Sequence, residues 1–290
     1  MITAFYSYTP GVGCTMASVN IAILLCKEFR KRVLLVDWNF ATPKLLMWME
    51  SISQSPTATF INLLSEYKSL IEGEQPISTE MLPLCRNFAN PTAIPGLDFL
   101  PVSSGSELDN STLASFDWAE FYADYNGGAI IEHIRNQWSQ AYDIVIVISE
   151  KGMSDAASVC TLQVADVVVL MMSMNNWEIK AAEMIAQSIR NPELKRDGRP
   201  INVLPVPSKT SLFEAELRQK LREYLRAMFS QHLPYGINAT DYFSGIEIPA
   251  IPYYEMSHEI AVLHEPLARP QIIVESYREI VKRLLTLAPV

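Results

Sequence analysis

The chain has 290 residues, of which 49% are hydrophobic, so it can bury a large core. Its net charge of −9 argues against a broad cationic surface for nucleic acid. No apolar run reaches the roughly 18 residues of a transmembrane segment, and the N-terminus does not resemble a signal peptide. The four cysteines have no paired spacing, which predicts free thiols and a cytoplasmic protein.

The first residues predict a strand, a glycine loop and a helix. Residues 2–8 are strand-like, Gly11 and Gly13 follow at loop spacing, and a helix is predicted over 15–30. Such a turn aims backbone N–H groups and a helix dipole at an anion. The candidate phosphate-binding residues are Gly11, Val12, Gly13, Cys14, Thr15 and Met16. The alternative is that the glycines only permit a tight turn, because Cys14 stands where such loops normally carry a cation.

The rest of the chain alternates between strand-like and helix-like segments. Strands are predicted at 32–37, 97–102, 142–148, 167–172, 201–206 and 246–251, and helices at 58–72, 176–190, 211–229 and 271–287. A proline-rich surface loop is predicted over 73–96, and a helical insert near 105–140. This order predicts one α/β domain over 1–290, a doubly wound, mainly parallel sheet with helices on both faces. Ligands of such sheets bind at the carboxyl edge of the strands.

Several motifs resemble the MinD/ParA family of P-loop ATPases, specifically a bacterial subgroup whose loop reads K-G-G-V-G-R-[ST]-M-A. Residues 9–17 lie on that loop, and 117–122 with the glycine pair at 127–128 match its D-W-x-x-F-Y segment. Residues 142–155, 204–207 and 248–254 match its switch region and its late segments. The resemblance implies a P-loop NTPase fold with ATP or ADP and magnesium as candidate cofactors. It also implies Pro207 beside the nucleotide and Thr15 and Asp37 near the metal.

The charged positions of the family pattern are replaced in this chain. Thr9 replaces the signature lysine, Cys14 the loop lysine, Asn39 a catalytic aspartate and Ile148 the Walker B aspartate. Phosphoryl transfer depends on electrostatic stabilisation and positioning, so the resemblance implies a pseudo-ATPase. Two alternatives stay open. One is an active ATPase that uses replacement residues, and the other is a scaffold that binds no nucleotide.

Some of these residues allow two interpretations. Lys44 and Lys151 either supply the missing positive charge or are solvated loop lysines. Cys14 is either a reactive thiol with a depressed pKa or a small residue that fills space. Asp37 either contacts water on a magnesium ion or caps the end of its strand.

Two groups of apolar residues are candidates for contacts with other molecules. The helix at 271–287 either targets a membrane or, as we prefer, docks on the sheet. The aromatic residues Trp118, Phe121, Tyr122 and Trp138 form either a partner surface or, more commonly, a small core. The resemblance implies a protein partner or a homo- or hetero-oligomer, and a place in a bacterial multi-protein system, defence systems among them.

Overall fold

One eight-stranded sheet organises the chain in the computed structural model, which describes residues 1–72, 84–191, 200–210, 215–264 and 272–288. The strand order is β3-β4-β2-β5-β1-β6-β7-β8, and every pair is parallel except β3–β4. The strands are β1 (Ile2–Tyr6), β2 (Val33–Trp38), β3 (Asn90–Pro91), β4 (Leu97–Leu100), β5 (Ile144–Ser149), β6 (Val167–Ser173), β7 (Asn202–Thr210) and β8 (Ile248–Pro249). The predicted doubly wound, mainly parallel sheet is therefore confirmed.

The central strands consist of nearly continuous apolar residues because both faces of the sheet are covered. Every residue of β1, β2 and β5 is buried. In β5, Ile148 pairs with Phe5 of β1 and with Asp37 of β2, so these three residues mark the carboxyl edge of the central strands. The loops that follow β1, β2 and β5 consequently meet at this edge.

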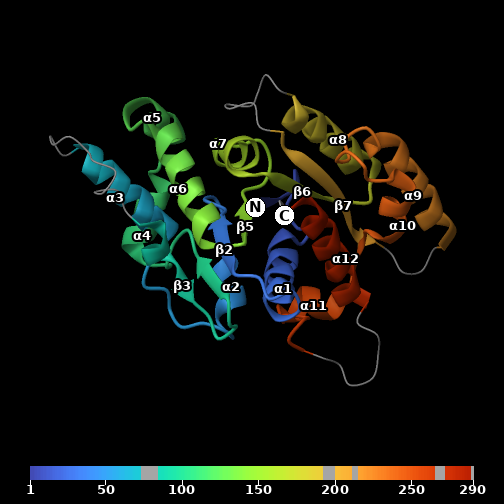
Figure 1. The fold of residues 1–290 in the computed structure, drawn as a ribbon, viewed down its shortest axis with the longest axis horizontal. Coiled ribbons are helices and arrows are strands. Elements are labelled where there is room, and N and C mark those ends of the chain that lie inside the picture. The colour runs from blue at the N-terminus through green and yellow to red at the C-terminus, as the bar shows by residue number, and fades with distance from the viewer. Residues whose placement is uncertain (73–83, 192–199, 211–214, 265–271, 289–290) are drawn as a thin grey trace.

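The connecting helices lie on both faces, as Figure 1 shows with α1 and α12 next to each other below the strands and α6 and α8 above them. The helices are α1 (Cys14–Lys27), α2 (Leu45–Met49), α3 (Phe60–Glu72), α4 (Glu107–Ala114), α5 (Trp118–Asp124), α6 (Gly127–Ala141), α7 (Asp155–Ser158), α8 (Asn176–Arg190), α9 (Ala215–Phe229), α10 (Ala239–Gly245), α11 (Pro252–Ser257) and α12 (Ile272–Leu287). Crossovers between parallel strands are right-handed, so the face that a connecting helix covers depends on the direction in which the next strand is added to the sheet. Strands are added here on both sides of β1, and the helices therefore cover both faces.

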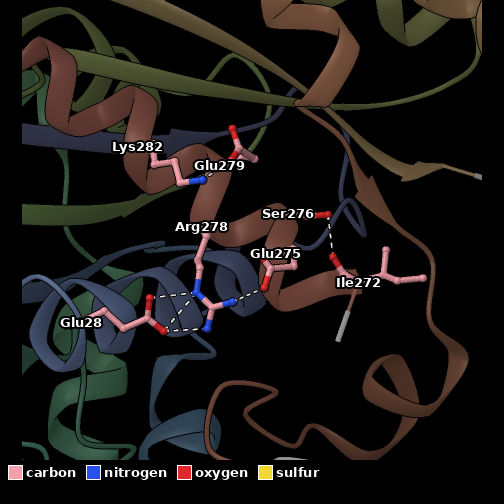
Figure 2. Close-up of polar contacts among 7 residues, drawn as sticks. All are labelled: Glu28, Ile272, Glu275, Ser276, Arg278, Glu279 and Lys282. Atoms are coloured by element: carbon pink, nitrogen blue, oxygen red, sulfur yellow. Dashed lines mark hydrogen bonds and ion pairs between the residues drawn. The ribbon is translucent and has the colours of Figure 1, made fainter. Parts of the chain in front are cut away.

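The closing helix α12 docks on α1. Its buried side includes Ile273, Tyr277, Ile280 and Leu284, which places its apolar face in the core. Arg278 on its exposed side forms a two-pronged contact with Glu28 just after α1, at 2.7–3.1 Å (Figure 2). The preferred docked helix is therefore confirmed, and its apolar face is not available to a membrane. None of the described helices is both long and apolar enough to span a bilayer.

Some element boundaries differ from the predictions. Helix α1 ends at Lys27, because Arg30 adopts a left-handed φ of 55° at the turn into β2. Within the predicted surface loop over 73–96, residues 73–83 lie outside the described part of the chain. Its remainder contains a 3₁₀ turn (Cys85–Phe88) and the short edge strand β3, which a proline-rich sequence obscures.

The segment predicted as a helical insert forms α4, α5 and α6, and α6 packs against β5. Phe121 and Trp138 are fully buried and Trp118 is nearly so. Trp118 stacks on Trp38 at 5.7 Å between ring centres, so these aromatics form core packing, as we preferred. The four cysteines are free, as predicted.

Candidate functional site

The loop between β1 and α1 turns on two glycines. Gly11 and Gly13 have φ angles of 87° and 93°, in the left-handed region that favours glycine. The loop is fixed from two sides, because the Ser7 hydroxyl donates to the carbonyl of Thr9 and the Ser208 hydroxyl of β7 donates to that of Val12. The glycines thus permit a tight turn, and these two hydrogen bonds fix its shape.

The amino end of α1 lacks a side-chain cap. Its N-cap residue is Gly13, which has no side chain to accept from the first amides of the helix. These N–H groups and the positive end of the helix dipole face the cavity lined by residues 11–16. An anion bound there would satisfy donors that the chain leaves open.

Cys14 is a buried thiol. Its side chain is 5% exposed, and burial raises its pKa to about 11, although Ser7 and the charge of Lys151 act in the opposite direction. The interpretation of Cys14 as a thiolate nucleophile is therefore wrong, since desolvation outweighs the helix terminus. Cys14 fills space inside the loop.

A cavity of about 190 Å³ opens above the glycine loop. Its charged lining residues are three lysines, Lys44, Lys151 and Lys209, and one carboxylate, Glu255. The remaining lining residues are Ser7, Gly11, Val12, Gly13, Cys14, Thr15, Met16, Trp48, Ile148, Ser149, Tyr254 and His258. The cavity is therefore electropositive although the chain as a whole carries a net charge of −9.

Lys151 follows the end of β5 in a loop that is tied to β1. The Gly152 amide donates to the Ser7 carbonyl at 3.3 Å, and the Tyr6 hydroxyl donates to the Gly152 carbonyl at 2.9 Å. Gly152 has a φ of 72°, which lets the loop turn sharply after Lys151. These contacts fix the backbone on which Lys151 enters the cavity.

Lys44 is held in place by Asp37. One Asp37 oxygen accepts from the backbone amides of Lys44 (3.2 Å) and Leu45 (3.1 Å), and the other accepts from that of Asn39 (3.1 Å). Asp37 is 2% exposed, and burial raises its pKa to about 6 even though these hydrogen bonds favour the ionised form. Asp37 therefore caps the strand end and the start of α2, the second of its two interpretations.

The four replaced positions occupy different places around the cavity. Two of them, Cys14 and Ile148, line it. All of the predicted loop residues 11–16, Thr15 among them, line it as well. Asn39 is buried, and its side-chain oxygen accepts from Thr42. Thr9 lies near the Glu178 carboxylate, which belongs to the first turn of α8.

Pro207 lies within β7, paired with Met172 of β6, and is not among the described residues that line the cavity. Lys209, two residues further on, lines it instead.

Lys209 is one of the lining residues that the sequence did not reveal. It has a left-handed φ of 56° at the irregularity where β7 pairs with β8, and its amine contacts Glu255 at 3.0 Å. Trp48 and His258 also meet at the cavity, with 5.6 Å between their ring centres. They come from segments about 210 residues apart, so no local pattern joins them.

A larger cavity of about 550 Å³ lies beside the loop that carries Lys151. It is lined by Phe40, Trp118, Glu150 and Asp155 among others, and none of its described lining residues is basic. Its acidic character makes it unsuitable for an anion, so the smaller cavity over the glycine loop is the candidate site.

Solved structures with this fold come from several organisms. Apo McdA from Cyanothece matches with a TM-score of 0.68 and 14% identity over 98% of each chain. The septum site-determining protein MinD with Mg-ADP from Pyrococcus horikoshii matches at 0.60 and 16%, over 99% of this chain and 96% of MinD. A ParA family ATPase from Chlorobium tepidum matches at 0.61 and 13%, over 98% of each chain. The chain therefore has the fold of MinD/ParA-type P-loop ATPases.

No protein-family model matches the chain, and no curated protein sequence does either.

Proposed function

We propose that this chain, which has the MinD/ParA fold, is a P-loop protein that binds a phosphate-rich ligand, such as a nucleotide, without hydrolysing it. The observation that carries this proposal is the combination of an uncapped, glycine-built loop with three lysines from other parts of the chain, two in loops and one near the end of β7. The P. horikoshii MinD structure holds Mg-ADP, which supports a nucleotide as the ligand class. The protein then acts as a binding or regulatory component together with a protein partner, in line with the subgroup that its motifs resemble.

We expect no hydrolysis because the positions that carry catalytic aspartates in the family pattern present no carboxylate to the cavity. Ile148 presents an alkyl side chain to the cavity, and the oxygens of Asp37 are used by backbone amides. Asn39 is an amide whose oxygen accepts from Thr42. No described carboxylate that lines the cavity is available to position an attacking water, since Glu255 contacts Lys209.

The second candidate is an active ATPase that uses replacement residues. The observation in its favour is that Lys44 and Lys151 both line the cavity, so cations are present despite Cys14. Lysines can neutralise phosphate charge in the transition state, but they do not replace the group that orients water. We therefore place this candidate second.

The test combines a binding titration with a turnover assay on the purified full chain. We expect saturable binding of ATP or ADP and no phosphate release above a protein-free control. Turnover that is abolished by Thr15→Ala would establish the active ATPase instead. Absence of binding to ATP, ADP and pyrophosphate would leave the scaffold interpretation.

A further inference from the structure

The cavity offers poor ligands for magnesium. Mg²⁺ is held mainly by carboxylates, waters and phosphate oxygens. Asp37 is 2% exposed, its oxygens accept three backbone hydrogen bonds, and it does not line the cavity. Glu255, the one carboxylate among the described lining residues, contacts the Lys209 amine at 3.0 Å. Of the two residues that the resemblance places near a metal, Asp37 therefore does not fit a magnesium ion, and only the Thr15 hydroxyl could serve as a ligand.

Positive charge is supplied by the protein instead. Three lysines, Lys44, Lys151 and Lys209, reach the cavity from the loops or strand ends after β2, β5 and β7. Among the described residues, no ion pair involves Lys44 or Lys151. Asp37 does not line the cavity, although its carboxyl interacts electrostatically with Lys151. The uncapped amides of α1 add further donors. Because Glu255 offsets the charge of Lys209, the three lysines leave a net two positive charges at the cavity without a metal ion.

From these contacts we propose that the site takes its ligand as a metal-free polyphosphate anion, with Lys44 and Lys151, the two lining lysines that no described ion pair involves, in place of both the loop lysine and magnesium. This inference rests on the proposed function. A magnesium ion on the phosphates cancels two of their negative charges, so it weakens their attraction to the lysines. The chain therefore binds the free anion at least as tightly as the magnesium complex, which distinguishes it from a site built around a metal.

The first experiment compares calorimetric titrations of the full chain with ATP, ADP and inorganic tripolyphosphate, in EDTA and in excess Mg²⁺. We expect binding in EDTA, with affinity lowered severalfold when magnesium is added. Binding that requires magnesium would overturn the inference and leave the proposed function intact. Absence of binding in both buffers would contradict the proposed function itself.

The second experiment assigns the charge to named residues. Lys151→Met is expected to reduce tripolyphosphate affinity in EDTA at least tenfold, because it removes a charge-assisted contact. Lys220→Met is the matched control, since Lys220 lies on α9, does not line the cavity and has a highly exposed side chain. Equal affinities for both variants would contradict the role assigned to Lys151. Circular dichroism and thermal melting of each variant establish that it is folded.

Discussion

The Glu150 carboxylate accepts a hydrogen bond from the backbone amide of Ala41 at 3.1 Å, and this contact joins the loop that carries Lys151 to the loop that carries Lys44. The two loops follow β5 and β2, neighbouring strands in the sheet. Glu150 thus acts on the cavity through the backbone, and its own side chain borders the larger, acidic cavity.

Removing this hydrogen bond is expected to weaken anion binding, although the change in charge alone would strengthen it. Glu150→Ala deletes a negative charge near the lysines, which by itself would favour anion binding. It also frees the loops, so we expect about three- to tenfold weaker tripolyphosphate binding, because ordering them again costs entropy. Glu150→Gln keeps the acceptor and is expected to bind as well as the wild type or better. If both variants bind more tightly to the same degree, the link does not position the loops.

Restoring a cation in the glycine loop is expected to strengthen phosphate binding. Cys14→Lys adds a charge-assisted contact at the amino end of α1, which we expect to raise affinity about tenfold in calorimetry. The same change places a cation near Lys151, whose charge already acts on Cys14, so the ligand-free protein is expected to melt at a lower temperature. Cys14→Ser is the neutral control. Unchanged affinity in Cys14→Lys would mean that the cavity is not the phosphate site.

The buried Asp37 predicts a specific pH dependence of stability. Its pKa is raised to about 6 in the folded protein, against about 3.9 in an unfolded chain. Between about pH 4 and pH 6 the folded state retains a proton that the unfolded state loses. The contribution of Asp37 to the free energy of unfolding therefore falls as pH rises, by up to about 3 kcal/mol. Urea unfolding across this range should show that Asp37→Asn lacks this decline. Asp155→Asn, at an exposed carboxylate, should retain it.

Two buried tyrosines provide a matched pair for stability. The Tyr277 hydroxyl on α12 has no hydrogen-bond partner among the described residues, whereas the Tyr242 hydroxyl donates to the Pro205 carbonyl at 3.1 Å. Both side chains are fully buried. We expect Tyr277→Phe to raise the free energy of unfolding by about 1 kcal/mol and Tyr242→Phe to lower it by about 1 kcal/mol. Similar losses in both variants would show that the Tyr277 hydroxyl has a partner in solution.

The position of Thr9 bears on assembly. In the family that the motifs resemble, a signature lysine at this position crosses a two-fold interface to the neighbour's nucleotide. Thr9 carries no charge and lies near Glu178 of its own chain. We therefore expect any oligomer to keep the same mass in light scattering with and without magnesium–ATP. A monomer that dimerises only when nucleotide is added would contradict this expectation.

The sequence by itself determined the sheet and the glycine loop. Buried parallel strands are recognisable as short apolar runs, and β1, β5 and β6 were predicted within a few residues. Gly11 and Gly13 were identified because they follow a strand-like run at phosphate-loop spacing and precede a helix. In the structure both have a positive φ. Boundaries were less certain where a single backbone angle ends an element, as at Arg30.

Only the tertiary structure decided what surrounds the loop. The strand order places the ends of β2, β5 and β7 around one cavity, and so brings Lys44, Lys151 and Lys209 together from distant segments. The sequence raised the first two as candidates but gave no sign of Lys209, whose left-handed backbone interrupts the pairing of β7 with β8. The role of Asp37 was likewise undecided until three backbone amides were seen to occupy its oxygens. Local patterns encode helices and strands because they depend on neighbouring residues, whereas a site at the edge of a parallel sheet depends on the order in which the strands are laid side by side.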